Sequence, residues 1–505
     1  MNATWLFLAC WAQSQTLPNG VELPSEWPPR TNVTKDVASP PYLAAPPAVI
    51  PIDVGRQLFV DDFLVESTTL ERTYHRARYH EASPVLRPDR AWEDAVAMPF
   101  SDGVWYDPAD RLYKMWYMAG KARHTCLATS ADGLSWTKPE LDVKAGTNIV
   151  NSGPRDSSTV WLDLDEKDPK RRYTMFRCGS GGSTVPKAYG LRMFFSEDGI
   201  HWGEPVLLSG SCGDRSTVFK NPFRDVWVYS LRHGWGQPRA RRYWERADLL
   251  KSPMWSAIGE PAMWVGADDL DPQRPDYKVP CQLYNLDAVA YESLIVGLFT
   301  IWRGQFPDRQ KPNEICLGFS RDGYHWTRPD RRPFCPVSDQ QGTWNANNVQ
   351  SAGGGFLVVG DELRFYVSGR AGVAGSNAEG TCSTGLAVLR RDGFASLDGE
   401  GAVTTRPVRF AGKHLFVNLD GELHAEVLDE EGKVLGRSEG VAGDKTLLPV
   451  PIDLAPFAGK PVRFRFHLKK GRLYAFWVSS DPAGASRGYV AAGGPGFAGS
   501  RDLPR

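Results

Sequence analysis

Apolar segments of strand length, each bounded by Gly, Pro, Asp or Asn, follow one another along most of the chain. In the middle of the sequence they come in pairs, and the pairs are GVWYD with LYKMWYM, STVWLDL with RYTMFR, STVFKN with VWVYSLR, AVAYE with LIVGLFTIW, and GGFLVVG with LRFYVSG. Short segments rich in aromatic and β-branched residues, separated by turn residues, are typical of antiparallel strands. The pattern predicts an all-β fold without a helix of useful length.

A second pattern, Ser-x-Asp-Gly-x-x-Trp, recurs after these pairs as SADGLSW (130–136), SEDGIHW (196–202) and SRDGYHW (320–326). A shortened copy, RRDGFAS, begins at residue 390, and ADLLKSPMW (247–255) keeps the tryptophan of a damaged copy. The repeat length is about 60 residues. The Asp-Gly pair suits a tight turn between the third and fourth strands of a unit, with the tryptophan between neighbouring units. We therefore assign the pattern to the scaffold and not to catalysis.

Four short antiparallel strands, repeated five times, predict a five-bladed β-propeller. The last unit lacks a clear fourth strand, and the segment YHEASPVLRPD (79–89) could supply it and close the ring. From about residue 404, alternating strands with an EEGK hairpin turn predict a C-terminal β-sandwich. The expected organisation is a possible signal segment (1–15), a Pro-rich tether (16–52), the propeller (53–400), the sandwich (401–485) and a Gly-rich tail (486–505).

Composition narrows the range of partners. Lys and Arg together number 59, as do Asp and Glu, so the chain gives no electrostatic reason to expect binding to nucleic acid or to an anionic membrane. No stretch is long and apolar enough to span a bilayer, and the short apolar run at residues 5–12 favours export to the periplasm or secretion. The eight cysteines form no CxxC pair, and we expect mostly free buried thiols.

Acidic residues lead the predicted inner strands. In a propeller, the innermost strand of every blade begins at the rim of the central channel, and reading these leading residues gives Asp102, Asp156, Asp214, Asp287 and Asn347. Carboxyl groups that meet at one place cannot all stay ionised, so their pKa values separate into an acid and a base, as glycosidic cleavage requires. An Asp ahead of a strand can instead simply cap a turn, but four in register favour a site.

Other residues near these acids suit a sugar ligand. Arg215, His233 and Arg303 could donate hydrogen bonds, and Trp302 could lie under a pyranose ring. Glu292 falls at the turn after an inner strand, where it is either structural or, if that hairpin is shifted, the general acid. No HExxH, P-loop or GxSxG motif and no paired His/Cys spacing is present, so no cofactor is expected, although an axial Ca²⁺ would be compatible with the acids.

On these residues the chain resembles the five-bladed propeller glycosidases of glycoside hydrolase families 32 and 43. More closely, it resembles a group of uncharacterised bacterial proteins, common in planctomycetes, described as family-32-like. The stretches that carry the resemblance are GRQLFVDDFLVES (55–67), GDRSTVFKNPFRDVWVYSLR (213–232), AYESLIVGLF (290–299), RRDGFASLDG (390–399) and RFHLKKGRLYAFWVS (465–479). In those families three acids on successive inner strands serve as base or nucleophile, orienting Asp and Glu general acid. The resemblance implies the first role for Asp102 and the second for Asp156, and Asp214 stands where the families place Glu.

The sequence and the resemblance together predict a glycoside hydrolase acting on a complex polysaccharide or oligosaccharide. Asp102 would be base or nucleophile and Asp214 or Glu292 the general acid, and the substrate would be bound by Asp156, Arg215, His233, Asp287, Trp302, Arg303 and Asn347. A non-catalytic glycan-binding propeller is an alternative. So is a glycoside phosphorylase, in which Arg215, Arg232 and His233 would hold phosphate. A sialidase-like enzyme would need six blades and three converging arginines.

Overall fold

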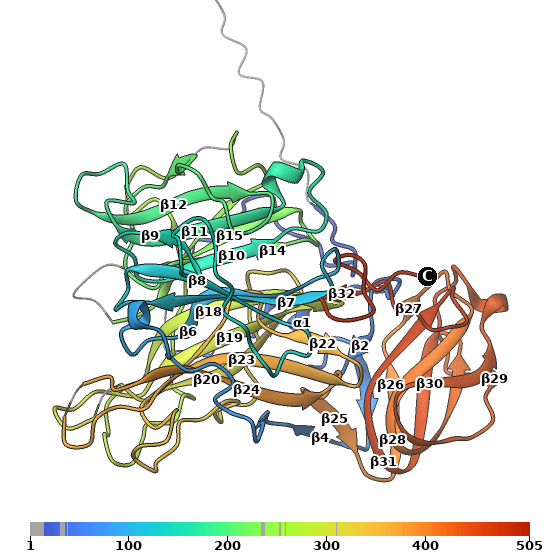
Figure 1. The fold of residues 1–505 in the computed structure, drawn as a ribbon. Coiled ribbons are helices and arrows are strands. Elements are labelled where there is room, and N and C mark those ends of the chain that lie inside the picture. Colours follow the sequence, from blue (N-terminus) through green and yellow to red (C-terminus); the bar gives the residue numbers. More distant parts are fainter. Residues whose placement is uncertain are drawn as a thin grey trace, which may run out of the picture.

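The protein is nearly all β-structure. The computed structural model describes residues 15–30, 36–37, 39–233, 238–251, 254–257, 259–309, 311–376 and 378–504. Within these ranges the helices are one short α-helix, α1 (Pro41–Ala44), and single 3-10 turns at Ala91–Glu93, Pro169–Arg171 and Ala455–Phe457. None of the described helices is long and apolar enough to cross a membrane. Figure 1 shows a larger group of sheets beside a smaller one that holds most of the C-terminal strands.

The first three repeats each form a four-stranded antiparallel sheet in chain order. The first sheet holds β6 (Met98–Asp107), β7 (Leu112–Ala119), β8 (His124–Ser130) and β9 (Ile149–Ser152). The second holds β10 (Ser158–Leu162), β11 (Tyr173–Ser180), β12 (Tyr189–Ser196) and β13 (Leu207–Leu208). The third holds β14 (Thr217–Asn221), β15 (Val226–Arg232), β16 (Arg241–Arg246) and β17 (Ala262–Val265).

The later repeats form two further antiparallel groups. One holds β18 (Gln282–Glu292), β19 (Leu294–Trp302) and β20 (Asn313–Ser320), and the other holds β21 (Asn348–Ser351), β22 (Leu357–Val359), β23 (Glu362–Arg370) and β24 (Cys382–Arg390). A single parallel bridge, Asn313 to Asn348, joins them. The short strand β5 (Arg78–Tyr79) pairs with β24, which confirms the prediction that a segment ahead of the first repeat covers the edge of the last one.

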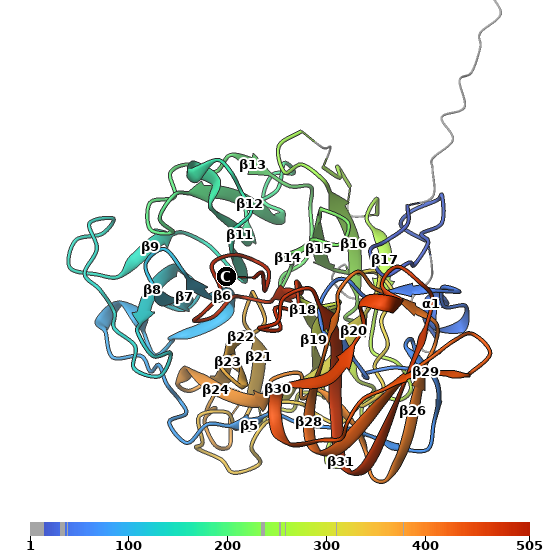
Figure 2. The ribbon, with the colours of Figure 1, turned by 90° about the vertical axis from the view of Figure 1, so that its right-hand side faces the viewer.

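The inner strands of these sheets lie around a common centre. β6 contacts β10, β10 contacts β14, β14 contacts β18, and β21 contacts β6. Figure 2 shows this arrangement, with the C-terminal tail lying across the centre of the ring. The tail contains β32 (Tyr489–Val490), which pairs with the end of β18, and the amide of Tyr106 on β6 donates to the carbonyl of Ala492 at 3.0 Å. The tail therefore closes one end of the ring.

The repeated Asp-Gly turns connect neighbouring sheets, as predicted for a scaffold motif. In the first turn, Asp132 Oδ1 accepts hydrogen bonds from the amides of Leu134 and Ser135 at 2.7 and 2.8 Å. The carbonyl of Gly133 accepts a hydrogen bond from the hydroxyl of Tyr366, in the last sheet of the ring, at 2.6 Å. In the second turn the carbonyl of Gly199 accepts a hydrogen bond from Trp116 Nε1, and in the third turn the carbonyl of Asp322 accepts one from Asn221 Nδ2. Each donor belongs to the preceding sheet.

The second group of strands is one strongly bent sheet over its own apolar core. It holds β2 (Gln57–Leu58), β3 (Val65–Thr68), β4 (Glu71–Tyr74), β25 (Ala395–Asp398), β26 (Gly401–Thr405), β28 (His414–Leu428), β29 (Val434–Arg437), β30 (Val441–Asp453) and β31 (Arg463–Ser479), while β1 (Ile50–Pro51) pairs with β27 (Val408–Arg409). The expected boundaries at residues 53 and 400 are therefore corrected: residues 57–74 and 395–398 pair with this sheet and not with the ring.

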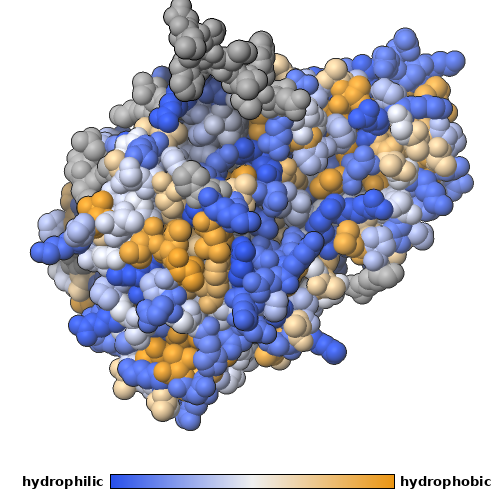
Figure 3. All heavy atoms as spheres, turned by 90° about the horizontal axis from the view of Figure 1, so that it is seen from above, coloured by the Kyte–Doolittle hydropathy of each residue, from blue (hydrophilic) through white to orange (hydrophobic). Residues whose placement is uncertain are grey.

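The Pro-rich segment at residues 16–52 is not a free tether in its described part. Leu17, Leu23 and Tyr42 are buried in the core of the C-terminal sheet, and Tyr42 also donates to the carbonyl of His325 in the ring at 3.1 Å. The expected signal segment lies outside the described residues apart from residue 15, so export stays a prediction. On the face shown in Figure 3, hydrophobic side chains form small patches between hydrophilic ones.

A buried charge cluster joins the ring, the C-terminal sheet and the tail. The Arg56 Nη1 atom donates to Asp392 Oδ2 at 2.8 Å and to the carbonyl of Thr446 at 2.7 Å. Its backbone amide donates to Glu292 Oε2 at 3.0 Å, and Ser486 in the tail donates to the same oxygen at 2.6 Å. The side chains of Arg56, Glu292 and Asp392 are fully buried, so each charge depends on the others for compensation.

Replacing Arg56 by Met would leave Asp392 and Glu292 as buried carboxylates with less compensation. We expect the free energy of unfolding to fall by about 3–5 kcal/mol, as for other broken buried ion pairs, measured by denaturant unfolding. Arg472→Met, at a side chain that is 51% exposed, is the matched control and should change the free energy of unfolding by less than about 1 kcal/mol. Equal effects of the two substitutions would contradict the role given to the cluster.

Candidate active site

The predicted acids lie at the end of the ring opposite the tail, which we call the mouth. Asp102 lies in β6 and Asp287 in β18, whereas Asp156, Asp214 and Asn347 come just before β10, β14 and β21. Hydrogen bonds connect these positions across the sheets. The Arg215 Nη2 atom donates to Ser101 Oγ at 2.9 Å, and Ser101 Oγ donates to Asp287 Oδ2 at 2.7 Å. The structure thus brings the inner-strand acids into one network.

Asp102 lies at the bottom of this network. Its side chain is fully buried, and Oδ2 accepts a hydrogen bond from Arg155 Nη2 at 2.9 Å. Burial raises the pKa of Asp102, and the Arg155 guanidinium opposes that rise. A carboxyl group without exposed surface cannot touch a sugar in this conformation. The structure therefore gives Asp102 a supporting position behind the mouth and does not favour it as base or nucleophile.

Asp156 and Asp214 are the partly exposed acids of the mouth. The backbone amide of Arg215, the residue after Asp214, donates to Asp156 Oδ1 at 2.8 Å, so the loops that carry the two acids are in direct contact. Asp214 also forms an ion pair with Arg232, and its side chain is 24% exposed. Burial and the nearby Asp156 raise the pKa of Asp214, and Arg232 opposes that rise. Asp214 is therefore the acid of this pair whose pKa its surroundings raise.

Asp287 is a buried acceptor. Its Oδ2 atom receives hydrogen bonds from Ser101 and Ser351 at 2.7 and 2.6 Å and from Asn285 at 2.9 Å. Asn347 is also buried, and its Oδ1 atom has no hydrogen-bond partner within the described part of the chain. Both residues are buried inside the ring.

His233 and Trp302 lie at the partly exposed edge of the mouth. The Nδ1 atom of His233 accepts a hydrogen bond from Arg242 Nε at 3.0 Å, and burial lowers the pKa of His233. The Trp302 ring is half-buried and lies 5.1 Å from the guanidinium of Arg239. Arg215 is buried, and its guanidinium lies 3.8 Å from the Phe100 ring. Of these residues, Trp302 and His233 keep surface that a ligand could reach.

Two predicted site residues lie elsewhere. Glu292 is fully buried in the Arg56 cluster, five residues beyond Asp287 along β18, which is about 16 Å of extended strand. The Arg303 side chain is also buried, where it donates to Glu314 at 3.1 Å and to the carbonyl of Pro272 at 2.9 Å. Both side chains are held by internal partners, which corrects their assignment to general acid and substrate binding.

Sequence reasoning missed several arginines of the mouth. Arg155 pairs with Asp102, Arg370 pairs with Glu379, and Arg241 donates to the carbonyl of Arg215 at 2.7 Å. Arg155 directly precedes Asp156, so its position in the sequence was a usable signal. Arg241 and Arg370 lie at ends of the second or third strand of their sheets, where no leading-residue pattern points to them.

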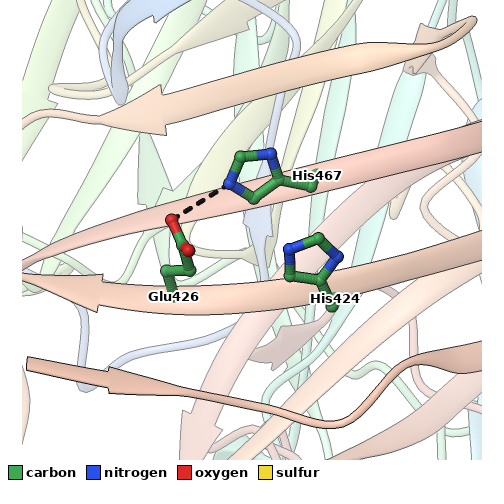
Figure 4. A group of neighbouring side chains, drawn as sticks. All are labelled: His424, Glu426 and His467. Carbon is green, nitrogen blue, oxygen red and sulfur yellow. Dashed lines mark hydrogen bonds and ion pairs between the residues drawn. The ribbon is translucent and has the colours of Figure 1, made fainter. Parts of the chain in front are cut away.

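A group with metal-ligand chemistry lies on the C-terminal sheet, away from the mouth. His424, Glu426 and His467 offer ligand atoms within 4.8 Å of one another (Figure 4). Glu426 is already paired with Arg437, Arg465 and His467, and these groups hold its pKa down to about 2. The imidazole rings are stacked at 4.5 Å with an interplanar angle of 7°, so their lone pairs do not converge on one point. The group is better described as an ion-pair network than as a metal site.

No family model and no curated protein matches the sequence. Among solved structures, the chain is similar to an N-acetylgalactosamine deacetylase from F. plautii, with 15% identity over 66% of this chain and 96% of that one and a TM-score of 0.41. It is similar to a glycoside hydrolase family 43 arabinoxylan arabinofuranohydrolase from Bacillus subtilis, with 10% identity over 79% and 98% and a TM-score of 0.38. It is also similar to a fructofuranosidase from Schwanniomyces occidentalis, with 12% identity over 80% and 97% and a TM-score of 0.37.

These neighbours are carbohydrate-active enzymes, among them glycoside hydrolases, at low sequence identity. With TM-scores below 0.5, the similarities do not by themselves define what this chain does. The resemblance to the planctomycete family-32-like group is not tested by them and stays a prediction.

The contact between the Asp156 and Asp214 loops predicts that the charge of Asp156 acts on the pKa of Asp214. Removing the Asp156 charge in Asp156→Asn takes away one cause of the raised pKa of Asp214, so that pKa should fall. Carbon-detected NMR of ¹³C-labelled Asp carboxyls, with Asp214→Asn used to assign the signal, measures the shift. An unchanged or higher pKa of Asp214 would show that the two carboxyls do not interact.

Proposed function

We propose that this protein is a glycoside hydrolase in which Asp214 and Asp156 carry out acid and base catalysis at the mouth of a five-bladed β-propeller. The C-terminal sheet would be the predicted β-sandwich. One observation supports this reading above the others: two partly exposed acids from adjacent inner strands touch through their loops, and one of them has a raised pKa.

The roles follow from the surroundings of each acid. Asp214, whose pKa is raised, is suited to hold a proton and donate it to the leaving oxygen of a glycosidic bond. Asp156 accepts a hydrogen bond from the backbone amide of Arg215, and such a hydrogen bond stabilises a carboxylate. Asp156 would therefore act as base or nucleophile. Asp102 and Asp287 would hold the loops through Arg155 and Ser101 without touching the sugar.

The C-terminal tail closes the end of the ring that lies away from these acids. The tail meets β18 beyond Asp287, where the amide of Ala491 donates to the carbonyl of Ala290 at 3.1 Å. It also meets β22, where the amide of Val358 donates to the carbonyl of Gly493 at 2.9 Å. A substrate would therefore enter from the mouth. No metal is required in this proposal, because Asp102 and Asp214 are each paired with an arginine that a cation would have to displace.

Sugar release from a polysaccharide panel tests the proposal. Wild-type protein should release reducing sugar from at least one substrate without added metal, and Asp214→Asn and Asp156→Asn should each lower kcat by about 100-fold or more. Asp62→Asn, at a side chain that is 70% exposed, is the matched control and should retain activity. Glu292→Gln should lower the unfolding free energy while the folded protein keeps its kcat, because Glu292 lies in the Arg56 cluster.

Three outcomes would contradict this account. Activity that survives both mouth substitutions would place catalysis elsewhere. Glycan binding without turnover on any substrate would indicate a non-catalytic binding propeller. Turnover that requires inorganic phosphate would indicate a glycoside phosphorylase.

A further inference from the structure

Two cations at the edge of the mouth form no ion pair with the residues that the structure describes. Arg239 and Lys311 are both partly exposed, and neither lies within ion-pair distance of a carboxylate in the described part of the chain. The guanidinium of Arg239 lies 5.4 Å from the Tyr284 ring, and the ammonium of Lys311 lies 5.8 Å from the same ring. The Tyr284 ring thus has two positive charges near it, one from each of two loops.

The strand ends fix this arrangement. The amide and the Nη1 atom of Arg239 both donate to Gln282 Oε1 at 3.0 Å, and Gln282 begins β18 opposite Trp302 at the end of β19. The carbonyl of Lys311 accepts a hydrogen bond from Asn348 Nδ2 at 3.0 Å, which ties the second loop to β21. The side chain of Arg239 is therefore held by Gln282, and the backbone of Lys311 is tied to β21.

The positive charge continues beneath the surface. Arg241 is fully buried and donates to neutral oxygens, among them Ser230 Oγ at 3.0 Å and the carbonyl of Arg215 at 2.7 Å. Burial and the neighbouring Arg215 lower the pKa of Arg241 to about 9, as expected where positive charges are close together without full compensation. An anion at the edge of the mouth would relieve this repulsion.

The proposal rests on the function proposed above. We propose that Arg239, Lys311, Tyr284 and Trp302 form a subsite for an oxyanion on the glycan, a sugar carboxylate or a sulfate ester, next to Asp214. The planar guanidinium of Arg239 can donate paired hydrogen bonds to two oxygens of such a group, and Lys311 adds a point charge. The half-buried Trp302 offers a ring face to the sugar that carries the anion. The substrate class is therefore an acidic glycan.

Binding to the inactive Asp214→Asn protein tests the subsite without dependence on turnover. The ligands are a neutral galacto-oligosaccharide, a uronate oligosaccharide of the same length, a sulfated oligosaccharide and inorganic phosphate, each titrated by calorimetry at low and high salt. We expect at least one acidic oligosaccharide to bind about tenfold or more tightly than the neutral one, with a preference that shrinks as salt rises. Which of the two binds distinguishes carboxylate from sulfate.

Variants separate this subsite from general attraction of anions. Arg239→Gln and Lys311→Gln, each in the Asp214→Asn background, should lower the affinity for the acidic ligand about fivefold or more. The affinity for the neutral ligand should change little. Arg472→Gln and Lys469→Gln on β31, with side chains 51% and 74% exposed, are the matched controls and should bind as the parent does. Circular dichroism of each variant checks that it is folded.

Several results would overturn the inference. Equal affinity of the protein for neutral and acidic oligosaccharides would contradict it. So would a loss of affinity for the acidic ligand in the control variants as large as the loss in the subsite variants. Tight binding of phosphate alone, lost in Arg239→Gln, would show that the oxyanion is a free co-substrate and not part of the glycan. Binding is measured without turnover, so the two proposals can fail separately. If the wild-type enzyme is active but the Asp214→Asn protein prefers neutral glycans, the subsite is contradicted and the proposed hydrolase activity is not.

Discussion

The buried ion pair between Arg56 and Asp392 is the constraint on which the assembly depends. Asp392 belongs to the last copy of the Asp-Gly repeat, but it does not cap its own turn as Asp132 does. It instead accepts hydrogen bonds from Arg56, Asn418 and Tyr291, which belong to the N-terminal segment, the C-terminal sheet and the ring. Because all of these side chains are buried, the sheets must stay in register for the charges to remain compensated.

Ring closure in turn creates the mouth. Three of the Asp-Gly turns accept a hydrogen bond from the neighbouring sheet, and β5 pairs with the last sheet, so the inner strands are held around one centre. This arrangement brings the acids that lead these strands close to one another. Arginines pair with Asp102 and Asp214, and burial together with the nearby Asp156 still raises the pKa of Asp214.

Repetition is why so much could be predicted from the sequence. The paired strands, the Asp-Gly turns and the positions of the inner-strand acids all follow a period of about 60 residues, and the missing fourth strand of the last unit indicated the closing segment. Features without a period were missed. The docking of residues 57–74 on the C-terminal sheet depends on long-range pairing, and the exclusion of Glu292 and Arg303 from the mouth depends on partners far away in the chain. The exposure that separates Asp214 from Asp102 is likewise a property of packing, which neither residue type nor spacing encodes.

The most direct test of the central claim is a crystal structure of Asp214→Asn with a bound oligosaccharide. We predict that a glycosidic oxygen lies within hydrogen-bond distance of the residue 214 side chain, with Asp156 on the other side of the bond. The sugar should enter from the mouth, opposite the C-terminal tail. An oligosaccharide bound only outside the mouth, with no sugar atom near Asp156 or residue 214, would contradict the account.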